Sequence, residues 1–284
     1  MNIGSFIFQG QSLYGVFDHD SVLPVCTALL IKYKTLRDLL DDDALFMLSD
    51  STNLTTAILL DDITFLPPIP NPRKIICVGL NYIKPYPIDG VAPPNPDNII
   101  LFGKERDTLL GHRASLEIPK GEPAYSFDYE GEIAVVISKS ARHLSVEDAL
   151  NHVLGYSIFN DGSVREWQKH SIYAGKNFAN SGSWGPWITT TEALPAVEEM
   201  ALTVTLNGKI VQSAFGREMI FNVAQQIAYA SSLFTLYPGD VIATGSPDGT
   251  GGSRTPKRYL QDKDVLSISV SGVGTMSNSV SLST

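Results

Sequence analysis

A proline-rich segment just before residue 73 constrains the organisation of the whole chain. Four of the seven residues at 66–72 are proline. Because proline lacks a backbone N–H and has a fixed φ, this segment cannot continue a helix or a central strand. We expect an extended linker here, so that residues 1–70 form a small N-terminal domain with its linker and residues 71–284 form a second, larger domain.

The larger domain is predicted to be α+β and mostly β. Runs rich in β-branched residues indicate short strands. They cover residues 74–80, 130–137, 241–244 and 265–270. Asn207-Gly208 lies between two further runs and is typical of a β-hairpin turn. Apolar residues recur at helical spacing over 219–234, which favours one longer helix there.

Three smaller elements are expected outside these runs. Residues 5–17 predict a pair of short strands, and the leucines in 35–48 predict a helix. Ser145 and Asp148 match a capping box, which marks the start of a helix. The apolar residues within 150–154 then continue that helix at the expected spacing.

The charge balance limits the classes of partner. Acidic residues outnumber basic ones, 30 to 21, and the net charge is −9. Nucleic acid and anionic membrane are therefore excluded as general partners, because both are negatively charged. The cysteines Cys26 and Cys77 form no C-x-x-C pair, and the first lysine is Lys32. We expect no secretory signal and a cytoplasmic protein with reduced thiols.

Two glutamates, Glu130 and Glu132, stand at the start of a predicted strand. Side chains alternate between faces along a strand, so these two point the same way. Neighbouring carboxylates repel each other unless a cation or protons lie between them, and oxygen ligands suit a hard divalent ion such as Mg²⁺ or Mn²⁺. The alternative interpretation is an exposed polar strand face, which is common.

A second polar group follows the apolar run at 155–160. Asp161 comes at the predicted end of that strand, where sites tend to be built. Arg165 and Gln168 are three residues apart on a predicted helical turn, so they face one pocket. Alternatively, Asp161 caps the turn and Arg165 pairs with Glu166 or another surface acid.

Two glycine-containing segments complete the set. Gly175-Lys176 precedes an Asn-Phe pair, and Thr244-Gly245 ends a predicted strand before a proline. The glycine and proline force a tight loop whose amide N–H groups are able to hold a carboxylate. A plain turn is the alternative interpretation.

Taken together, these segments resemble the fumarylacetoacetate hydrolase family over residues 70–280. The resemblance rests on ordered motifs, which are Val-Gly-Leu-Asn-Tyr at 78–82, Leu-Phe-Gly-Lys at 101–104, Glu-Gly-Glu at 130–132, Asn-Asp-Gly-Ser-Val-Arg at 160–165, Gly-Lys-Asn-Phe at 175–178 and Thr-Gly at 244–245. It implies a mixed β-sandwich roll as the fold of the larger domain, and a homodimer.

The same resemblance implies a set of site residues. A divalent ion, Mg²⁺, Mn²⁺ or Ca²⁺, would be held by Glu130, Glu132 and Asp161, with Lys176 as a catalytic residue. The implied partner is a small anionic 2-oxo acid substrate. The residues implied to bind it are Tyr82, Lys104, Arg165, Gln168, Thr244 and Gly245.

One segment departs from the family pattern. Relatives carry a His and a Glu in a lid after the first strand, and this pair activates water, whereas Pro85 and Ile88 occupy those positions here. Proline cannot transfer protons, and the proline-rich stretch predicts an irregular loop. The candidates for a substitute are His112, which we assign to the catalytic set, and His170 and Glu105. Each of the three also fits a structural or surface role.

Several reactions remain open, because a metal-stabilised enolate serves all of them. The first hypothesis is a hydrolase or lyase that cleaves or decarboxylates a β-diketo or oxaloacetate-like acid. The second is an isomerase or dehydratase acting on a muconate-like 2-oxo acid. The third is a non-catalytic homologue that binds the metal or a ligand, and the intact carboxylates weigh against it.

Overall fold

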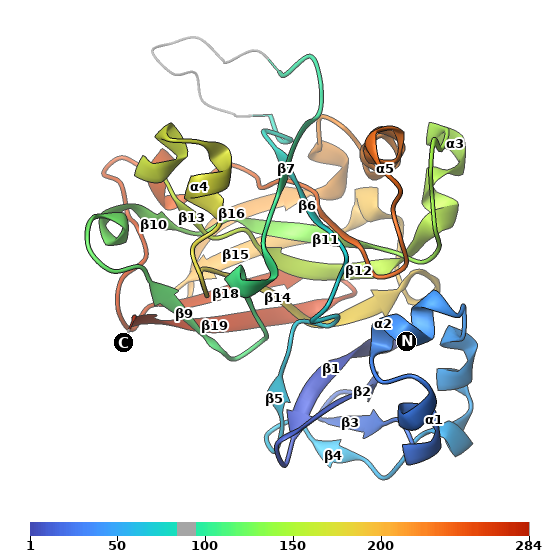
Figure 1. The fold of residues 1–284 in the computed structure, drawn as a ribbon. Coiled ribbons are helices and arrows are strands. Elements are labelled where there is room, and N and C mark those ends of the chain that lie inside the picture. Colours follow the sequence, from blue (N-terminus) through green and yellow to red (C-terminus); the bar gives the residue numbers. More distant parts are fainter. Residues whose placement is uncertain (84–94, 284) are drawn as a thin grey trace.

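The computed structural model describes residues 1–83 and 95–283. The protein is mostly β, as predicted, and its centre is a mixed sheet of twelve strands beside a sheet of five (Figure 1). The predicted irregular loop and the positions of Pro85 and Ile88 lie outside the described residues.

The large sheet collects strands from most of the chain. They are β1 (Asn2–Phe8), β2 (Gln11–Phe17), β3 (Ser21–Pro24), β4 (Ile58–Leu59), β5 (Thr64–Phe65), β6 (Ile75–Gly79), β7 (Ile100–Gly103), β8 (Leu109–Leu110), β11 (Gly131–Ile137), β12 (Val153–Asn160), β14 (Gly182–Thr190) and β17 (Val241–Ala243). Their main order is β4-β3-β2-β1-β14-β12-β11-β17-β6-β7, while β5 pairs with β1 and β8 with β14. The pairs β17·β6 and β14·β8 are parallel, so the sheet is mixed.

The second sheet lies against the large one. Its strands are β9 (Ser115–Ile118), β15 (Ala201–Leu206), β16 (Lys209–Phe215), β18 (Val265–Val270) and β19 (Gly274–Leu282), in the order β16-β15-β18-β19-β9. The β15–β16 turn is the predicted hairpin. Asn207 and Gly208 both have positive φ, 52° and 76°, which is the geometry that Asn-Gly favours. A separate ribbon pairs β10 (Phe127–Asp128) with β13 (Ser163–Val164).

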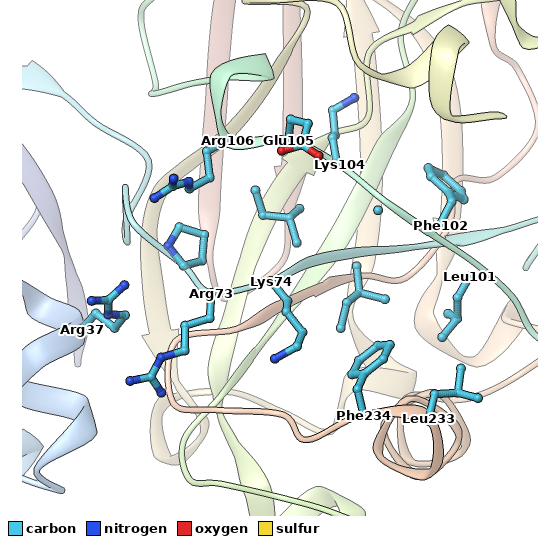
Figure 2. Close-up of a pocket in the computed structure, with 14 residues that line it drawn as sticks. Arg37, Arg73, Lys74, Leu101, Phe102, Lys104, Glu105, Arg106, Leu233 and Phe234 are labelled. Carbon is cyan, nitrogen blue, oxygen red and sulfur yellow. The ribbon is translucent and has the colours of Figure 1, made fainter. Parts of the chain in front are cut away.

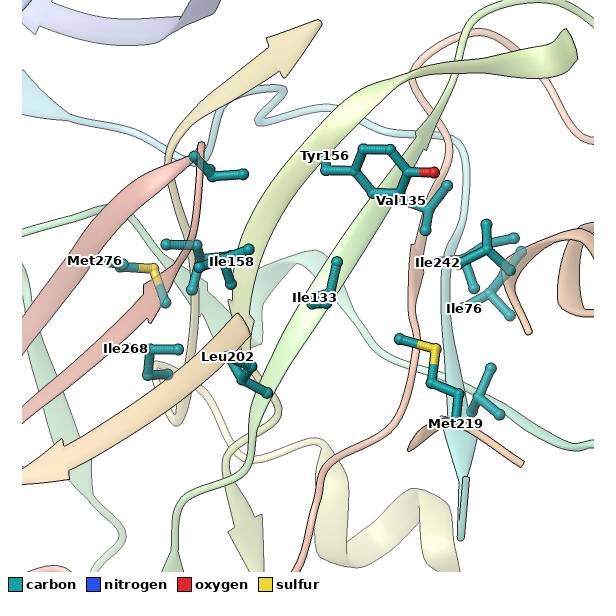
Figure 3. Packing of buried hydrophobic residues seen from close by; sticks show 14 of the residues in the cluster. Ile76, Ile133, Val135, Tyr156, Ile158, Leu202, Met219, Ile242, Ile268 and Met276 are labelled. Carbon is teal, nitrogen blue, oxygen red and sulfur yellow. The ribbon is translucent and has the colours of Figure 1, made fainter. Parts of the chain in front are cut away.

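Side chains from both sheets form the main hydrophobic core. Figure 3 shows part of it, including Ile133 and Ile158 from the large sheet and Leu202 and Ile268 from the smaller one. Ala134, on the opposite face of β11, belongs to a second cluster that includes the leucines of the N-terminal region. Every residue of β11 and β12 is therefore buried, and the ends of these two strands are held firmly.

The helices lie around the sheets. They are α1 (Thr27–Lys32), α2 (Leu36–Asp41), α3 (Val146–Ala149), α4 (Ile172–Lys176) and α5 (Val223–Leu233). The helix expected over 219–234 begins later than predicted, because Asn222 caps it by accepting a hydrogen bond from the Gln225 N–H. No helix in the described ranges combines the length and apolar character needed to cross a membrane.

Two other helix predictions need correction. The helix expected over 35–48 stops at Asp41, because Asp43 takes a positive φ of 53°, and only a 3₁₀ turn over Leu45–Ser49 follows. Ser145 does cap α3, but α3 is short, and the apolar residues from Val153 onward enter β12 instead. Burying these apolar side chains in a strand between two neighbouring strands was more favourable than the helix that their spacing predicted.

The N-terminal region is joined to the large sheet by strand pairing. Asn2 and Ile3 of β1 pair with Thr189 and Ile188 of β14. The proline-rich linker has no helix or strand, as predicted. The division of the chain into two domains at residue 70 stays a prediction, since the shared sheet and the second hydrophobic cluster connect the two parts.

We expect Gly155→Ala to lower the free energy of unfolding by about 1–3 kcal/mol through overpacking. A Cβ at Gly155 would lie 2.2 Å from the Thr189 carbonyl oxygen in the neighbouring strand. Urea unfolding measures the change. Gly103→Ala is the control, because a Cβ there meets nothing within 4 Å. Equal stability of the two variants would show that β12 and β14 can move apart.

Candidate metal centre and active site

Three carboxylates meet where β11 and β12 pair. Glu130 directly precedes β11, Glu132 lies within it, and Asp161 directly follows β12. The antiparallel register sets Gly131 opposite Asn160, and the Asp161 N–H donates to the Glu130 carbonyl at 2.8 Å. Each carboxylate offers an oxygen, and the three oxygens lie within 4.8 Å of one another. The structure thus brings together the three predicted metal ligands.

The donor set fits a hard divalent cation. Glu132 and Asp161 are buried, and Glu132 Oε2 accepts a hydrogen bond from the Gly245 N–H at 2.8 Å. Burial, together with the Asp161 and Glu130 carboxylates, raises the pKa of Glu132 well above its usual value. Such mutual repulsion is relieved when a cation binds between the carboxylates, and three carboxylate oxygens suit Mg²⁺ or Mn²⁺.

Two buried lysines contact this cluster. Lys176 Nζ lies 2.6 Å from Glu130 Oε2 and 2.5 Å from Asp161 Oδ2. Burial by itself lowers the pKa of Lys176, but the Asp161 and Glu130 carboxylates outweigh it and raise the pKa, so the group stays an ammonium. Lys104 Nζ lies 2.8 Å from Asp161 Oδ1 and donates to the carbonyls of Gly162 and Lys176.

Arg165 ties the cluster to a fourth carboxylate. Its Nε lies 2.7 Å from Asp128 Oδ2, and its Nη1 lies 2.5 Å from Glu130 Oε1. Burial would raise the pKa of Glu130, but Lys176 and Arg165 lower it to about 2. Asp128 also accepts the N–H groups of Gly251 and Gly252, so it anchors Arg165. The alternative pairing of Arg165 with Glu166 is not observed, because Glu166 pairs with Lys169.

A cavity of about 370 Å³ opens beside the carboxylates. Glu130, Arg165, Gln168 and Lys176 line it, as the sequence predicted for a common pocket. Tyr82 also lines it, and its hydroxyl is buried with no hydrogen-bond partner in the described part of the chain. Arg165 Nη2 is likewise buried without a partner there. Two buried hydrogen-bond donors beside the cavity are therefore unsatisfied within the described residues.

The sequence model described as fumarylacetoacetate (FAA) hydrolase C-terminal matches residues 74–281. The chain belongs to the fumarylacetoacetate hydrolase family. Among its curated relatives, oxaloacetate tautomerase YisK of Bacillus subtilis (strain 168) is 36% identical over 225 residues, which cover 78% of this chain and 74% of that protein.

Two solved structures of family members share the fold over 100% of both chains. Fumarylacetoacetate hydrolase from psychrophilic Exiguobacterium antarcticum has 29% identity and a TM-score of 0.83. Maleylpyruvate hydrolase from Sphingobium sp. SYK-6, solved in complex with a manganese(II) ion and pyruvate, has 26% identity and a TM-score of 0.82. These relatives of the chain are enzymes whose names refer to small organic acids.

Within this member of the family, His112 does not lie where the sequence analysis expected a catalytic residue. Its ring packs edge-on against Phe65 at 4.7 Å, and its Nδ1 accepts a hydrogen bond from the Ser277 N–H at 3.0 Å. Burial and then Arg113 lower the pKa of His112 to about 4. It is absent from the described lining of the cavity, so its contacts favour a packing role, and its catalytic role stays a prediction.

The other two proposed substitutes for the lid pair also have different surroundings. The His170 ring lies 4.9 Å from the Trp167 ring, and Glu105 accepts a hydrogen bond from the Tyr173 hydroxyl. Neither residue belongs to the described lining of the cavity. Each therefore takes the structural or surface role that was its alternative.

Three residues predicted to bind substrate face the protein interior. The Thr244 hydroxyl donates to the Ile133 carbonyl, and the Gly245 N–H donates to Glu132. Lys104 directs its ammonium to Asp161 and two carbonyls. Each already uses its donor within the fold, which favours a positioning role, and direct contact with substrate stays a prediction.

The loop after β17 forms a wall of the cavity that was not predicted from the sequence. Ser246, Pro247 and Asp248 line the cavity, although this loop was expected to act only through its backbone. The sequence did contain a signal for Asp248 as a site residue. It closely follows the strand that was predicted to end at Thr244, and sites tend to be built at strand ends. Phe102 also lines the cavity, and its ring lies 5.3 Å from Lys176 Nζ.

We expect Glu132→Gln to abolish stabilisation by Mn²⁺ without destabilising the metal-free protein. Glutamine keeps the shape of the side chain and an acceptor for Gly245, but it removes one of the repelling charges and one anionic ligand. Thermal unfolding with EDTA and with Mn²⁺ measures both effects. Glu199→Gln, at an exposed position, is the control and retains the wild-type response. A wild-type Mn²⁺ response in Glu132→Gln would contradict the metal assignment.

We expect His112→Asn to retain activity and to reduce acid sensitivity. The pKa of His112 is about 4 in the folded protein and ordinarily 6.5, so the unfolded chain binds the extra proton between these values. Stability is therefore lost as pH falls through this window, by about 1–2 kcal/mol at pH 5.

Asparagine keeps an acceptor for the Ser277 N–H but does not titrate, so this variant should lose less stability than wild type between pH 7 and pH 5. Urea unfolding of both proteins at the two pH values checks the difference. A large loss of turnover in His112→Asn would instead restore the catalytic assignment.

Proposed function

We propose that the protein interconverts the keto and enol forms of a small 2-oxo acid of the oxaloacetate type. The observation that carries this proposal is the cluster of three carboxylates, contacted by the Lys176 ammonium and open to a cavity of about 370 Å³. The described lining of that cavity contains no histidine, which weakens the case for an imidazole base that activates water.

Electrostatic stabilisation is the main contribution that these residues can make. A divalent ion held by Glu130, Glu132 and Asp161 would polarise the 2-oxo group and stabilise the enolate. Lys176 adds fixed positive charge at the same place. The Arg165 Nη2, which has no partner among the described residues, would donate a charge-assisted hydrogen bond to a substrate carboxylate.

Proton transfer at the carbon beside the 2-oxo group needs a separate base. Lys176 remains protonated, and Tyr82 does too, because burial and the Glu132 charge raise its pKa. Asp248 is partly buried, lines the cavity and forms no ion pair with any described residue. In our proposal an Asp248 Oδ takes the proton from that carbon and returns it to the enolate oxygen, so atoms and charge balance.

The comparisons favour tautomerisation over the other reactions. YisK, the relative at 36% identity, is named an oxaloacetate tautomerase. Cleavage or decarboxylation is the second candidate, because maleylpyruvate hydrolase shares the fold. The homodimer, the cytoplasmic location and the choice between Mg²⁺ and Mn²⁺ remain proposals that rest on the family resemblance.

We expect the protein to accelerate conversion of enol-oxaloacetate to its keto form in the presence of Mg²⁺ or Mn²⁺, without producing pyruvate. Ultraviolet absorbance follows the enol, and a coupled assay detects pyruvate. Asp248→Asn should lower kcat by about 10²- to 10⁴-fold, which is the usual contribution of a general base.

Asp262→Asn, at an exposed acid outside the cavity, is the matched control and should keep wild-type kcat. Pyruvate as the main product would favour the second candidate. Metal binding without any turnover on oxaloacetate, acylpyruvates or muconate-type acids would favour a non-catalytic binding protein.

A further inference from the structure

A second cavity, of about 770 Å³, lies between the N-terminal region and the edge of the large sheet (Figure 2). It is lined from α2, the proline-rich linker, β6, β7, the 3₁₀ turn over Arg106–Thr108 and the end of α5. We propose that this cavity binds an amphipathic organic anion, with a phosphate or carboxylate head at its arginine-rich end and an apolar body of several carbons at the other. This site goes beyond the proposed function.

Basic side chains gather at one end of the cavity. Arg37, Arg73, Lys74 and Arg106 all line it, and Figure 2 shows the guanidinium groups of the three arginines on the side of the N-terminal region. This cluster is positively charged, whereas the whole chain has a net charge of −9. Glu105 also lines the cavity, and Asp41 and Asp240 pair with two of the cations, so an anion would be bound by the positive charge that remains.

Three of these cations have acidic residues within 4.0 Å, and only Arg106 has none in the described ranges. Arg73 lies 3.0 Å from Asp41, and Lys74 lies 3.4 Å from Asp240. Arg37 donates through Nη1 to a linker carbonyl, but its Nε is buried with no hydrogen-bond partner in the described residues. Its contacts with Asp38 and Asp41, at 3.9 and 3.7 Å, are too long for hydrogen bonds.

Arg106 is exposed and forms no ion pair within the described ranges. Together with Arg37, it offers the planar donor groups that match phosphate or carboxylate oxygens. The two residues come from distant parts of the chain, α2 and the turn after β7, and both line the same cavity. The anionic head is therefore assigned to the space between them.

The opposite end of the cavity is apolar. Leu101, Phe102, Leu233 and Phe234 line it, and Figure 2 shows these side chains away from the arginines. Leu233 is 54% exposed although it is large and apolar, so covering it with a ligand is favourable. The volume lies within the range of small-molecule sites, which favours an apolar body rather than a bare ion.

Strand β7 separates this cavity from the metal centre. Ile100 lines the cavity beside the carboxylates, Leu101 lines the second cavity, and Phe102 contributes to both. Lys104 also belongs to the lining of the second cavity, but its side chain is fully buried and its ammonium contacts Asp161. The two cavities are therefore lined by different charged residues. Ligand binding in the second cavity can be measured without turnover at the metal centre.

Isothermal titration of the full chain in Mg²⁺ with octyl phosphate tests the proposal. We expect saturable one-to-one binding, with little binding of inorganic phosphate or octanol, and octanoate separates a carboxylate head from a phosphate head. Arg106→Gln should weaken binding at least about tenfold, as expected for a charged hydrogen-bond donor. Arg217→Gln, at an exposed arginine outside the cavity, is the matched control.

Glu132→Gln distinguishes this site from the metal centre. Octyl phosphate should bind this variant as it binds wild type, whatever reaction the enzyme catalyses. Loss of binding in Glu132→Gln would place the ligand on the metal and overturn the proposal. Equal binding by Arg106→Gln and Arg217→Gln, equal binding of octanol, or no saturable binding to the wild-type protein would also overturn it.

Discussion

The mutual repulsion of Glu130, Glu132 and Asp161 is the constraint on which the rest of the site depends. Three carboxylates with little access to water are stable only if positive charge lies close by. The fold supplies Lys176 from the end of α4, Lys104 after β7 and Arg165 before a 3₁₀ turn, each within 2.9 Å of a carboxylate oxygen. These cations offset the repulsion and hold the cluster in place, with one oxygen from each carboxylate within 4.8 Å of the others.

Rigid strands make this arrangement possible. β11 and β12 are buried along their whole length, because one face packs against the five-stranded sheet and the other against a second hydrophobic cluster. Close packing around Gly155 and Gly162 leaves no room for side chains beside the neighbouring strand. The carboxylates at the strand ends therefore cannot move apart to relieve their repulsion, and the positive charge has to be brought to them.

The cavity beside the carboxylates combines hydrogen-bond donors, fixed positive charge and one further acid. Tyr82 and Arg165 present free donors, Lys176 presents fixed charge, and Asp248 is the remaining carboxylate without an ion pair among the described lining residues. Under the proposed function, this set would serve proton movement next to an enolate rather than activation of water. On the other side of β7, a second group of cations lies next to an apolar wall. One edge strand therefore borders two cavities whose lining residues differ in chemistry.

The sequence by itself determined the elements whose signals are local. Four features depend on backbone geometry within a few residues. They are the alternation of Glu130 and Glu132, the position of Asp161 at a strand end, the Asn207-Gly208 hairpin and the proline-rich linker. Helix ends were less predictable, because burial and caps outside the apolar pattern decided them. Only the tertiary structure decided which cation meets which carboxylate, that His112 packs against Phe65, and that Arg37 and Arg106 border one cavity. These contacts join residues far apart in the chain, and their energies depend on distances and burial that exist only once the sheets have packed.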